Sequence, residues 1–220
     1  MGNVCGRRGL QTGSAYDEIV DYDEVIVDVD GEKRRAQALA SAAEAARVAK
    51  VAAVDNVYDL IKLSKDVRVT PDEMLRVARN PIDVCRISAA GFRVTSEAAV
   101  KMARNAEDIA LMFRSGAKID KDAALTYADD IKDVILLKRA GLSLLSADAM
   151  KYAFTTRDVV AMLNAGFTVG LEDAMYRVRF IYDIVDLATA GIVVPYKRAA
   201  EFAVSDYDRN ILAQLYPLYL

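Results

Sequence analysis

The sequence contains no histidine and no tryptophan, and it has only two cysteines, Cys5 and Cys85. Without histidine the chain holds neither a Ser-His-Asp nor a Cys-His catalytic group, and no zinc site with histidine ligands. Two cysteines make neither a disulfide framework nor an all-cysteine zinc site, so a cytoplasmic location is expected. We therefore expect no metal, no cofactor and no enzymatic activity. An enzyme that used carboxylates alone would need a buried acidic cluster.

Other features are also absent. Four prolines and 11 glycines among 220 residues exclude collagen-like and low-complexity chains. The apolar runs are too short for a transmembrane helix, and the first residues contain no apolar signal-peptide region. Neither of the glycine-rich phosphate-binding motifs, GxxxxGK[ST] or GxGxxG after a strand, is present. With 54% hydrophobic residues, the chain has enough apolar side chains to fill the core of one large or two small domains.

Three residue types recur at intervals of 25 residues, and this periodicity is the main signal in the sequence. The periodic positions are Gly91, Gly116, Gly141, Gly166 and Gly191; Asp83, Asp108, Asp133, Asp158, Asp183 and Asp208; and Ala78, Ala103, Ala128, Ala153 and Ala203, the last series interrupted by Val178. A fixed period of this length is typical of a solenoid or array.

The residues between a periodic aspartate and the next glycine predict a short helix. In DVILLKRAG, Asp133 is a preferred N-cap residue, and apolar residues follow at helical spacing. Gly141 stands where a helix ends in a left-handed C′ residue. We therefore predict that each periodic aspartate is an N-cap and each periodic glycine a helix stop.

A linker and a second helix follow each glycine. Two apolar positions flank a more variable one, as at Leu142 and Leu144. A new start signal comes next and is clearest in the segment Thr70-Pro71-Asp72-Glu73, which combines an N-cap, a proline at N1 and acidic residues in the first turn. The sequence thus predicts second helices such as 97–104, 122–129 and 148–154. Their paired alanines would let neighbouring helices approach closely.

The pattern predicts an all-α fold. It begins in an alanine-rich helix, residues 36–54, whose Ala49 and Ala53 take the small-residue positions, and it ends in a helix at 208–215. We predict a right-handed α-solenoid of about six short antiparallel helix pairs over residues 36–220, stabilised by contacts between neighbouring repeats. Residues 1–35 are predicted to be a flexible, acidic N-terminal leader.

The segments DAALTYADDIKDVILLKRAGLSL and ADAMKYAFTTRDVVAMLNAGFTV resemble the two helices of ankyrin repeats without the β-hairpin finger. The unit of 25 residues is shorter than the ankyrin unit of about 33 residues, and the TPLH signature is absent. Another short helical-pair repeat, such as a leucine-rich-repeat variant, is the alternative. The resemblance covers roughly residues 57–215 and implies a solenoid that binds proteins through one face, without catalytic residues.

The N-terminal region is acidic. Eight acidic residues lie between positions 15 and 32, together with Tyr16 and Tyr22. This region is interpreted either as a solvated leader or as an arm that docks on the basic face of its own or a neighbouring solenoid. In another interpretation, Gly2 and Cys5 carry acyl chains beside Arg7 and Arg8 and tether the protein to a membrane, although Gly6 departs from the acylation pattern.

Basic residues in the second helices would align as a ladder if the repeats stack. The candidate partner-binding residues are Arg76, Arg79, Lys101, Arg104, Lys151, Arg177 and Arg179, together with the aromatic residues Phe154 and Tyr176. Such a ladder suits an acidic protein segment, and a solvated charged face is the alternative. The net charge of −3 argues against a general nucleic-acid binder. Residues 33–220 alone carry only +3.

These observations predict a non-catalytic protein–protein interaction scaffold or adaptor that uses an elongated helical-repeat face. The partner is a protein whose identity the sequence does not give. The alternative is a self-assembling structural protein that forms homo-oligomers and is membrane-tethered where its N-terminus is acylated. Cys85 and the aligned residues Tyr127, Tyr152 and Phe202 are expected to serve packing.

Overall fold

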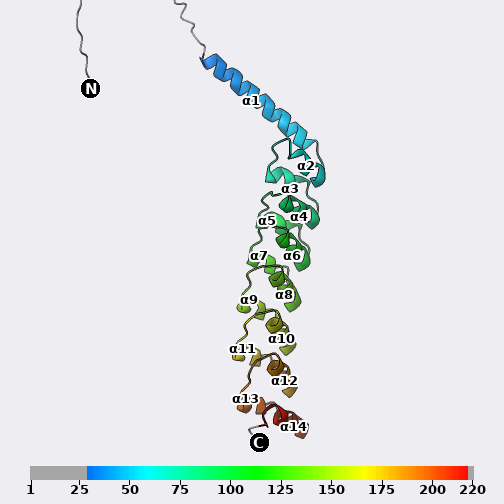
Figure 1. Cartoon of the computed structure of the whole chain (residues 1–220), viewed down its shortest axis with the longest axis vertical. Helices are drawn as coiled ribbons and strands as arrows, with labels where there is room; N and C mark the ends of the chain where they lie inside the picture. Colours follow the sequence, from blue (N-terminus) through cyan, green and yellow to red (C-terminus); the bar gives the residue numbers. More distant parts are fainter. Residues whose placement is uncertain (1–28, 218–220) are drawn as a thin grey trace, which may run out of the picture. The chain divides into compact units, whose positions relative to one another are not determined.

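The computed structural model describes residues 29–217, and these residues form fourteen α-helices with no β-strand among them (Figure 1). The prediction of an all-α fold is therefore confirmed. The chain divides into two compact units, Met1–Glu44 and Ala45–Leu220. Helix α1 (Val29–Ala52) begins in the first unit and ends in the second.

The described part of the first unit is helical from residue 29 onward. Asp30 and Glu32 lie in the first turn of α1, where the partial positive charge of the helix end favours carboxylates. An alanine-rich segment with high helix propensity follows. Residues 29–35, which the sequence assigned to the leader, are helical. The rest of the predicted leader, residues 1–28, lies outside the described residues.

The second unit contains thirteen further helices, which Figure 1 shows in two rows of alternate members. Each even-numbered helix from α2 to α12 contacts the next even-numbered helix. The helices are α2 (Val57–Leu63), α3 (Pro71–Val77), α4 (Pro81–Ala89), α5 (Ser96–Met102), α6 (Ala106–Arg114), α7 (Lys121–Leu125), α8 (Ile131–Arg139), α9 (Ser146–Met150), α10 (Thr156–Asn164), α11 (Leu171–Met175), α12 (Ile181–Thr189), α13 (Tyr196–Ala200) and α14 (Asp206–Leu215).

The five periodic glycines end helices α4, α6, α8, α10 and α12, as predicted. All five have positive φ, between 78° and 108°. After α8, the Gly141 N–H donates to the Lys138 carbonyl at 2.9 Å, and the Leu142 N–H donates to the Leu137 carbonyl at 3.2 Å. This pair of hydrogen bonds defines a Schellman motif and satisfies carbonyls that the helix itself leaves unpaired. The same two hydrogen bonds recur at the other four glycines.

The periodic aspartates are not N-caps, which corrects the prediction. Each is the third helical residue, and the N-cap lies three positions earlier: Asn80, Asn105, Asp130, Thr155, Phe180 and Ser205. The Asp158 carboxylate accepts hydrogen bonds from the backbone N–H groups of Phe154 and Thr155, both at 2.9 Å. A carboxylate on the third helical residue also interacts favourably with the positive end of the helix. Aspartate is therefore favourable both at the N-cap and at the third helical residue.

The second helices begin near the predicted start signals but end earlier than predicted. Thr70 forms the complete capping box with Glu73, and Pro71 follows at N1. Helix α7, however, ends at Leu125 rather than at 129. The next N–H groups, of Tyr127 and Ala128, bond three residues back at 3.1 and 3.2 Å. This tighter turning leads the chain into the next helix.

Small and apolar side chains fill the core of the second unit. Five second-helix alanines are completely buried, namely Ala99, Ala124, Ala149, Ala174 and Ala199. In each linker both apolar positions are buried or half-buried, and the more variable residue between them is exposed. The prediction for α1 is wrong, because Ala49 and Ala53 are exposed and Val51 is the residue of α1 that the core buries.

Glu73 links α1 to the first capping box of the second unit. Its carboxylate forms an ion pair with Arg47 at 3.1 Å and accepts from the Thr70 N–H at 2.8 Å. The hydrogen bond from Arg47 and that from the Thr70 backbone lower the pKa of Glu73 to about 2. Because this pKa is below the ordinary value, the interaction stabilises the fold above about pH 4.5 and is lost as the pH falls toward 2.

Replacing Gly166 with alanine should destabilise the second unit by about 1–2 kcal/mol, because an L-residue at positive φ is strained. An added Cβ at Gly166 meets no atom within 4 Å, so steric overlap contributes nothing. Urea unfolding would measure the change, with Asn164→Ala in the same helix as the control. Equal midpoints for the two variants would contradict the conformational role of Gly166.

Replacing Glu73 with glutamine should lower the free energy of unfolding at pH 7 by about 1–2 kcal/mol, since a charge-assisted hydrogen bond is lost. The difference from the parent protein should shrink below pH 4.5 and vanish near pH 2, where Glu73 itself is protonated. Unfolding measured across this pH range tests the prediction. Glu97→Gln, which removes an exposed pair with Lys101, is the control and should have little effect. A pH-independent difference would contradict the assignment.

Candidate interaction surface

The first predicted ladder residues bind backbone carbonyls of the preceding segment. The Arg76 guanidinium donates to the carbonyls of Val51 and Val54, at 3.1 and 3.4 Å. The guanidinium of Arg79 donates to the Asp55 carbonyl at 3.4 Å. These arginines therefore satisfy carbonyls at and after the end of α1, where the helix leaves acceptors unpaired.

The middle of the predicted ladder is paired with acids. Lys101 pairs with Glu97 at 2.7 Å, and the Lys151 ammonium lies 3.9 Å from the Asp148 carboxylate. The Nε of Arg104 donates to Asp108 at 2.9 Å. This hydrogen bond, together with one from the Arg104 backbone, holds the pKa of Asp108 below its ordinary value despite its burial. Equivalent positions in other repeats carry Thr126, Asp129 and Glu201, so the aligned surface is not uniformly basic.

The predicted aromatic residues are exposed, and the structure places further apolar side chains near the same end of the unit. Phe154 and Tyr176 are 60% and 81% exposed. Four further side chains, absent from the predicted set, are more than half exposed: Phe180, Tyr182, Val204 and Tyr207. The signal was present, because Tyr182 and Tyr207 are 25 residues apart and occupy the second residue of α12 and of α14.

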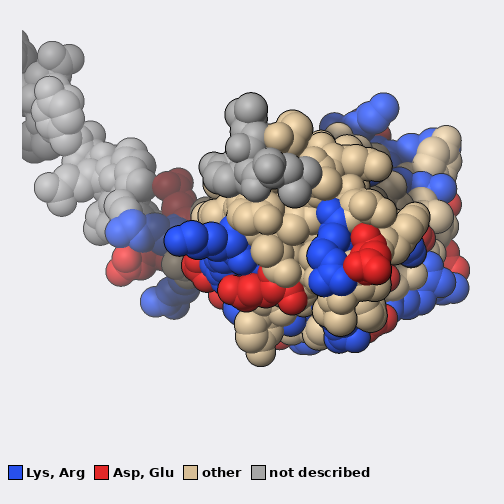
Figure 2. Space-filling model, turned by 90° about the horizontal axis from the view of Figure 1, so that it is seen from below, with Lys and Arg blue, Asp and Glu red and all other residues tan. Residues whose placement is uncertain are grey.

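The rings of Tyr182 and Tyr207 lie side by side, with centroids 6.4 Å apart. The proximity of the Tyr207 side chain raises the pKa of Tyr182. Viewed from the end that carries α14, uncharged residues form much of the visible surface, with charged side chains both among them and along the edges (Figure 2). We call Phe180, Tyr182, Val204 and Tyr207 the aromatic patch.

A ladder of hydrogen bonds joins neighbouring second helices. The Tyr127 hydroxyl donates to the Val100 carbonyl at 2.8 Å, and the Tyr152 hydroxyl donates to the Leu125 carbonyl at 2.9 Å. The half-buried side chains of Tyr127 and Tyr152 thus combine ring packing with a polar contact of the hydroxyl. Cys85 is half-buried against the core.

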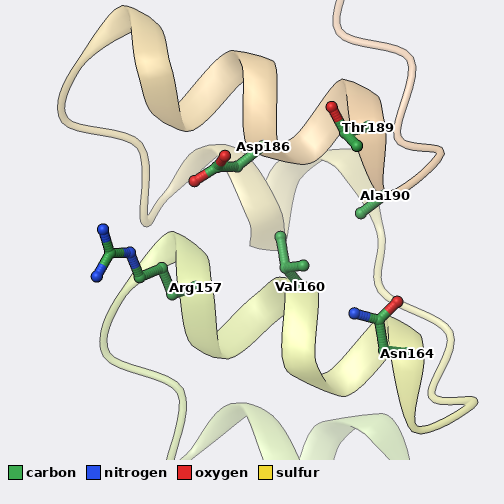
Figure 3. A pocket seen from close by; sticks show the side chains of 6 residues that line it. All are labelled: Arg157, Val160, Asn164, Asp186, Thr189 and Ala190. Carbon is green, nitrogen blue, oxygen red and sulfur yellow. The ribbon is translucent and has the colours of Figure 1, made fainter.

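Shallow grooves lie between consecutive even-numbered helices. One, of about 260 Å³, is lined by Arg157, Val160 and Asn164 of α10 and by Asp186, Thr189 and Ala190 at the end of α12. In Figure 3 the two sets face each other, with Arg157 and Asp186 near one end and Asn164 near the other. A second groove of about 420 Å³ lies between α8 and α10 and includes Lys132, Arg139 and Asn164. Both grooves are open and have mixed polar and apolar walls.

Other expected sites fall partly outside the described residues. The two candidate acylation sites, Gly2 and Cys5, lie in residues 1–28. Within residues 29–217, no group of three or more Cys, Asp or Glu side chains is arranged to hold a metal ion. None of the helices in that range is long and apolar enough to cross a membrane.

Comparison with known proteins adds no family to this description. No protein-family model, no curated protein and no solved structure matches the chain.

Replacing Tyr152 with phenylalanine should lower the free energy of unfolding by about 0.5–1.5 kcal/mol, because the Leu125 carbonyl loses one of its two donors while the ring packing remains. Tyr58→Phe, at an exposed position, is the control for removal of a hydroxyl. Chemical denaturation of both variants measures the difference. An effect of Tyr152→Phe no larger than that of Tyr58→Phe would contradict a stabilising role for this hydrogen bond.

Proposed function

We propose that residues 36–220 form an ankyrin-like α-solenoid of 25-residue helix pairs that acts as a non-catalytic protein-binding scaffold. The repeated Schellman motifs and the contacts between successive even-numbered helices support the solenoid. The small number of cysteines supports an intracellular location. The aromatic patch is the proposed contact surface for the partner.

The observation that carries this proposal is the exposure of aligned aromatic side chains on neighbouring repeats. Tyr182 is 52% exposed and Tyr207 is 64% exposed, although each is large enough to bury considerable apolar area. The equivalent residues of the three preceding repeats, Glu107, Lys132 and Arg157, are charged, and that of α4 is the exposed Ile82. Exposed aromatic clusters are typical of protein-binding surfaces, in which Tyr and Trp supply much of the binding energy.

The proposal predicts that the double variant Tyr182→Ser, Tyr207→Ser loses its partner. Full-length protein would be used to capture partners from a lysate of the source organism, with quantification of each captured protein. The amount of captured partner should fall at least about ten-fold, because the variant removes two contact side chains that each contribute about 1–2 kcal/mol to binding. The fold should persist, because both side chains are exposed.

The matched control is Glu107→Ser, Lys132→Ser, which changes the same helix positions in earlier repeats. It should retain the partner. Equal capture by both double variants would contradict the assignment of the aromatic patch. Capture of the bait alone, with concentration-dependent oligomers in sedimentation, would instead support self-assembly.

A further inference from the structure

Three arginines converge on a cavity of about 310 Å³ between the starts of α10 and α12. They are Arg157 of α10 and Arg177 and Arg179 of the segment that precedes α12. We propose that this arginine pocket binds the phosphate monoester of a phosphorylated side chain in the partner protein. The anion site is independent of the proposed function. Only the inference that a protein carries the phosphate rests on that function.

The other repeats provide an internal comparison for the pocket. The residues 25 positions before the three arginines are one cation and two aromatic residues. The residues 25 positions after them include no cation. The equivalents of Arg157, Arg177 and Arg179 are Lys132, Tyr152 and Phe154 before, and Tyr182, Phe202 and Val204 after. The stacking geometry of these repeats therefore does not require arginine at any of the three positions. Departures of this kind from a local rule are expected at functional sites.

Arg177 is the most informative of the three. It takes the position at which Tyr127 and Tyr152 donate a hydrogen bond to the preceding helix. Its own equivalent contact, from a guanidinium nitrogen to the Met150 carbonyl, is long at 3.5 Å. The Nε of Arg177 is buried and has no hydrogen-bond partner among the described residues. A buried donor without an acceptor is unfavourable, so this nitrogen contributes nothing to the stability of the fold, and the other guanidinium nitrogens of Arg177 are the ones available to a ligand.

The surroundings hold Arg177 in place. Its guanidinium carbon lies 5.0 Å from the centre of the Tyr176 ring, in a cation–π contact. The Thr156 hydroxyl donates to the Arg177 carbonyl at 3.0 Å and is almost completely buried. The backbone and the side chain of Arg177 are therefore both fixed before a ligand arrives, which reduces the entropy lost on binding.

The charge of the lining matches a phosphate better than a carboxylate. Asp183 is the acidic residue of the lining. Its carboxylate accepts hydrogen bonds from the backbone N–H groups of Arg179, at 2.7 Å, and of Phe180, at 3.0 Å. Three arginines and one aspartate give the lining a charge of +2. A phosphate monoester carries about −1.5 to −2 at pH 7, and guanidinium groups bind its oxygens in pairs.

The pocket adjoins the aromatic patch, which favours a phosphate carried by a protein. Phe180 lines the pocket and is 67% exposed, and Tyr182 lies two residues further along the chain. Residues that flank a phosphorylated side chain would therefore contact aromatic surface. Arg157 also lines the groove of Figure 3, so one side chain borders both the pocket and that groove.

Binding is tested by titrating full-length, ¹⁵N-labelled protein and following the Nε–Hε signals of its arginines. The probes are inorganic phosphate and two degenerate nonapeptide libraries, one with a central phosphoserine, phosphothreonine or phosphotyrosine and one with the unmodified residues. We expect saturable shifts of the Arg177 signal with inorganic phosphate and with the phosphorylated library. The dissociation constant for the phosphorylated library should be at least about ten-fold lower than that for phosphate. The unmodified library should leave the signal unchanged.

Arg177→Tyr is the main variant, because it restores the residue found in two other repeats and so preserves the fold. It should weaken phosphate binding at least about ten-fold, since a charge-assisted contact is lost. Lys132→Tyr, the same kind of change in the preceding repeat, is the matched control and should bind as the parent does. Absence of a saturable shift in the parent, or equal binding by the two variants, would overturn the anion site.

A further comparison distinguishes this inference from the proposed function. Treating the lysate with phosphatase should abolish capture of the partner, and Arg177→Tyr should reduce it. Capture that survives both changes, yet is lost with the Tyr182 and Tyr207 variants, would overturn the phosphorylated partner and leave the scaffold proposal standing. Phosphate binding equal to that of the phosphorylated library would assign the pocket to a small phosphate ligand and overturn the protein-borne source.

Discussion

The folding of the second unit depends on how its short helices end. Helices of five to ten residues are not stable alone in water, because too few hydrogen bonds offset the cost of helix initiation. At the C-terminal ends of α4, α6, α8, α10 and α12, a glycine with positive φ lets two N–H groups bond back to helix carbonyls. At their N-terminal ends, an aspartate carboxylate accepts N–H groups of the incoming chain. Each helix is thus fixed at both ends by groups from within one repeat.

These end contacts also determine what the core can contain. The Schellman turn directs the linker so that Leu142 and Leu144 both face inward, while the residue between them is exposed. The next helix then contacts the core through a fully buried alanine, such as Ala149. Since each helix pair is too small to bury its own apolar face, the neighbouring pair must cover it. The side-chain hydrogen bonds from Tyr127 and Tyr152 run between neighbours in the same way.

The sequence predicts the stops of the helices better than their starts. A glycine with positive φ has few substitutes, so Gly141 and its equivalents identify the helix ends without ambiguity. A carboxylate is favourable throughout the first turn, so Asp133 was compatible with two registers, and only the hydrogen bonds distinguish them. The periodic N-cap residues Asn80, Asn105 and Asp130 carried the missing information. The start of α1 escaped prediction because helix propensity alone, without a buried face, forms its first turns.

The candidate surface was less predictable for a related reason. A sequence shows which residues are charged but not which of them form ion pairs within the chain. In the structure, Lys101 and Arg104 pair with neighbouring acidic residues. Exposed aromatic residues look like core residues in a sequence, so Tyr182 resembles a packing residue until its position on α12 is known. A repeat provides a better criterion, because it shows what the fold requires at each position. Arg177 stands where an aromatic residue satisfies the fold in the repeats before and after it. Because the fold does not require a charge at this position, Arg177 is the residue on which the proposed anion site depends most.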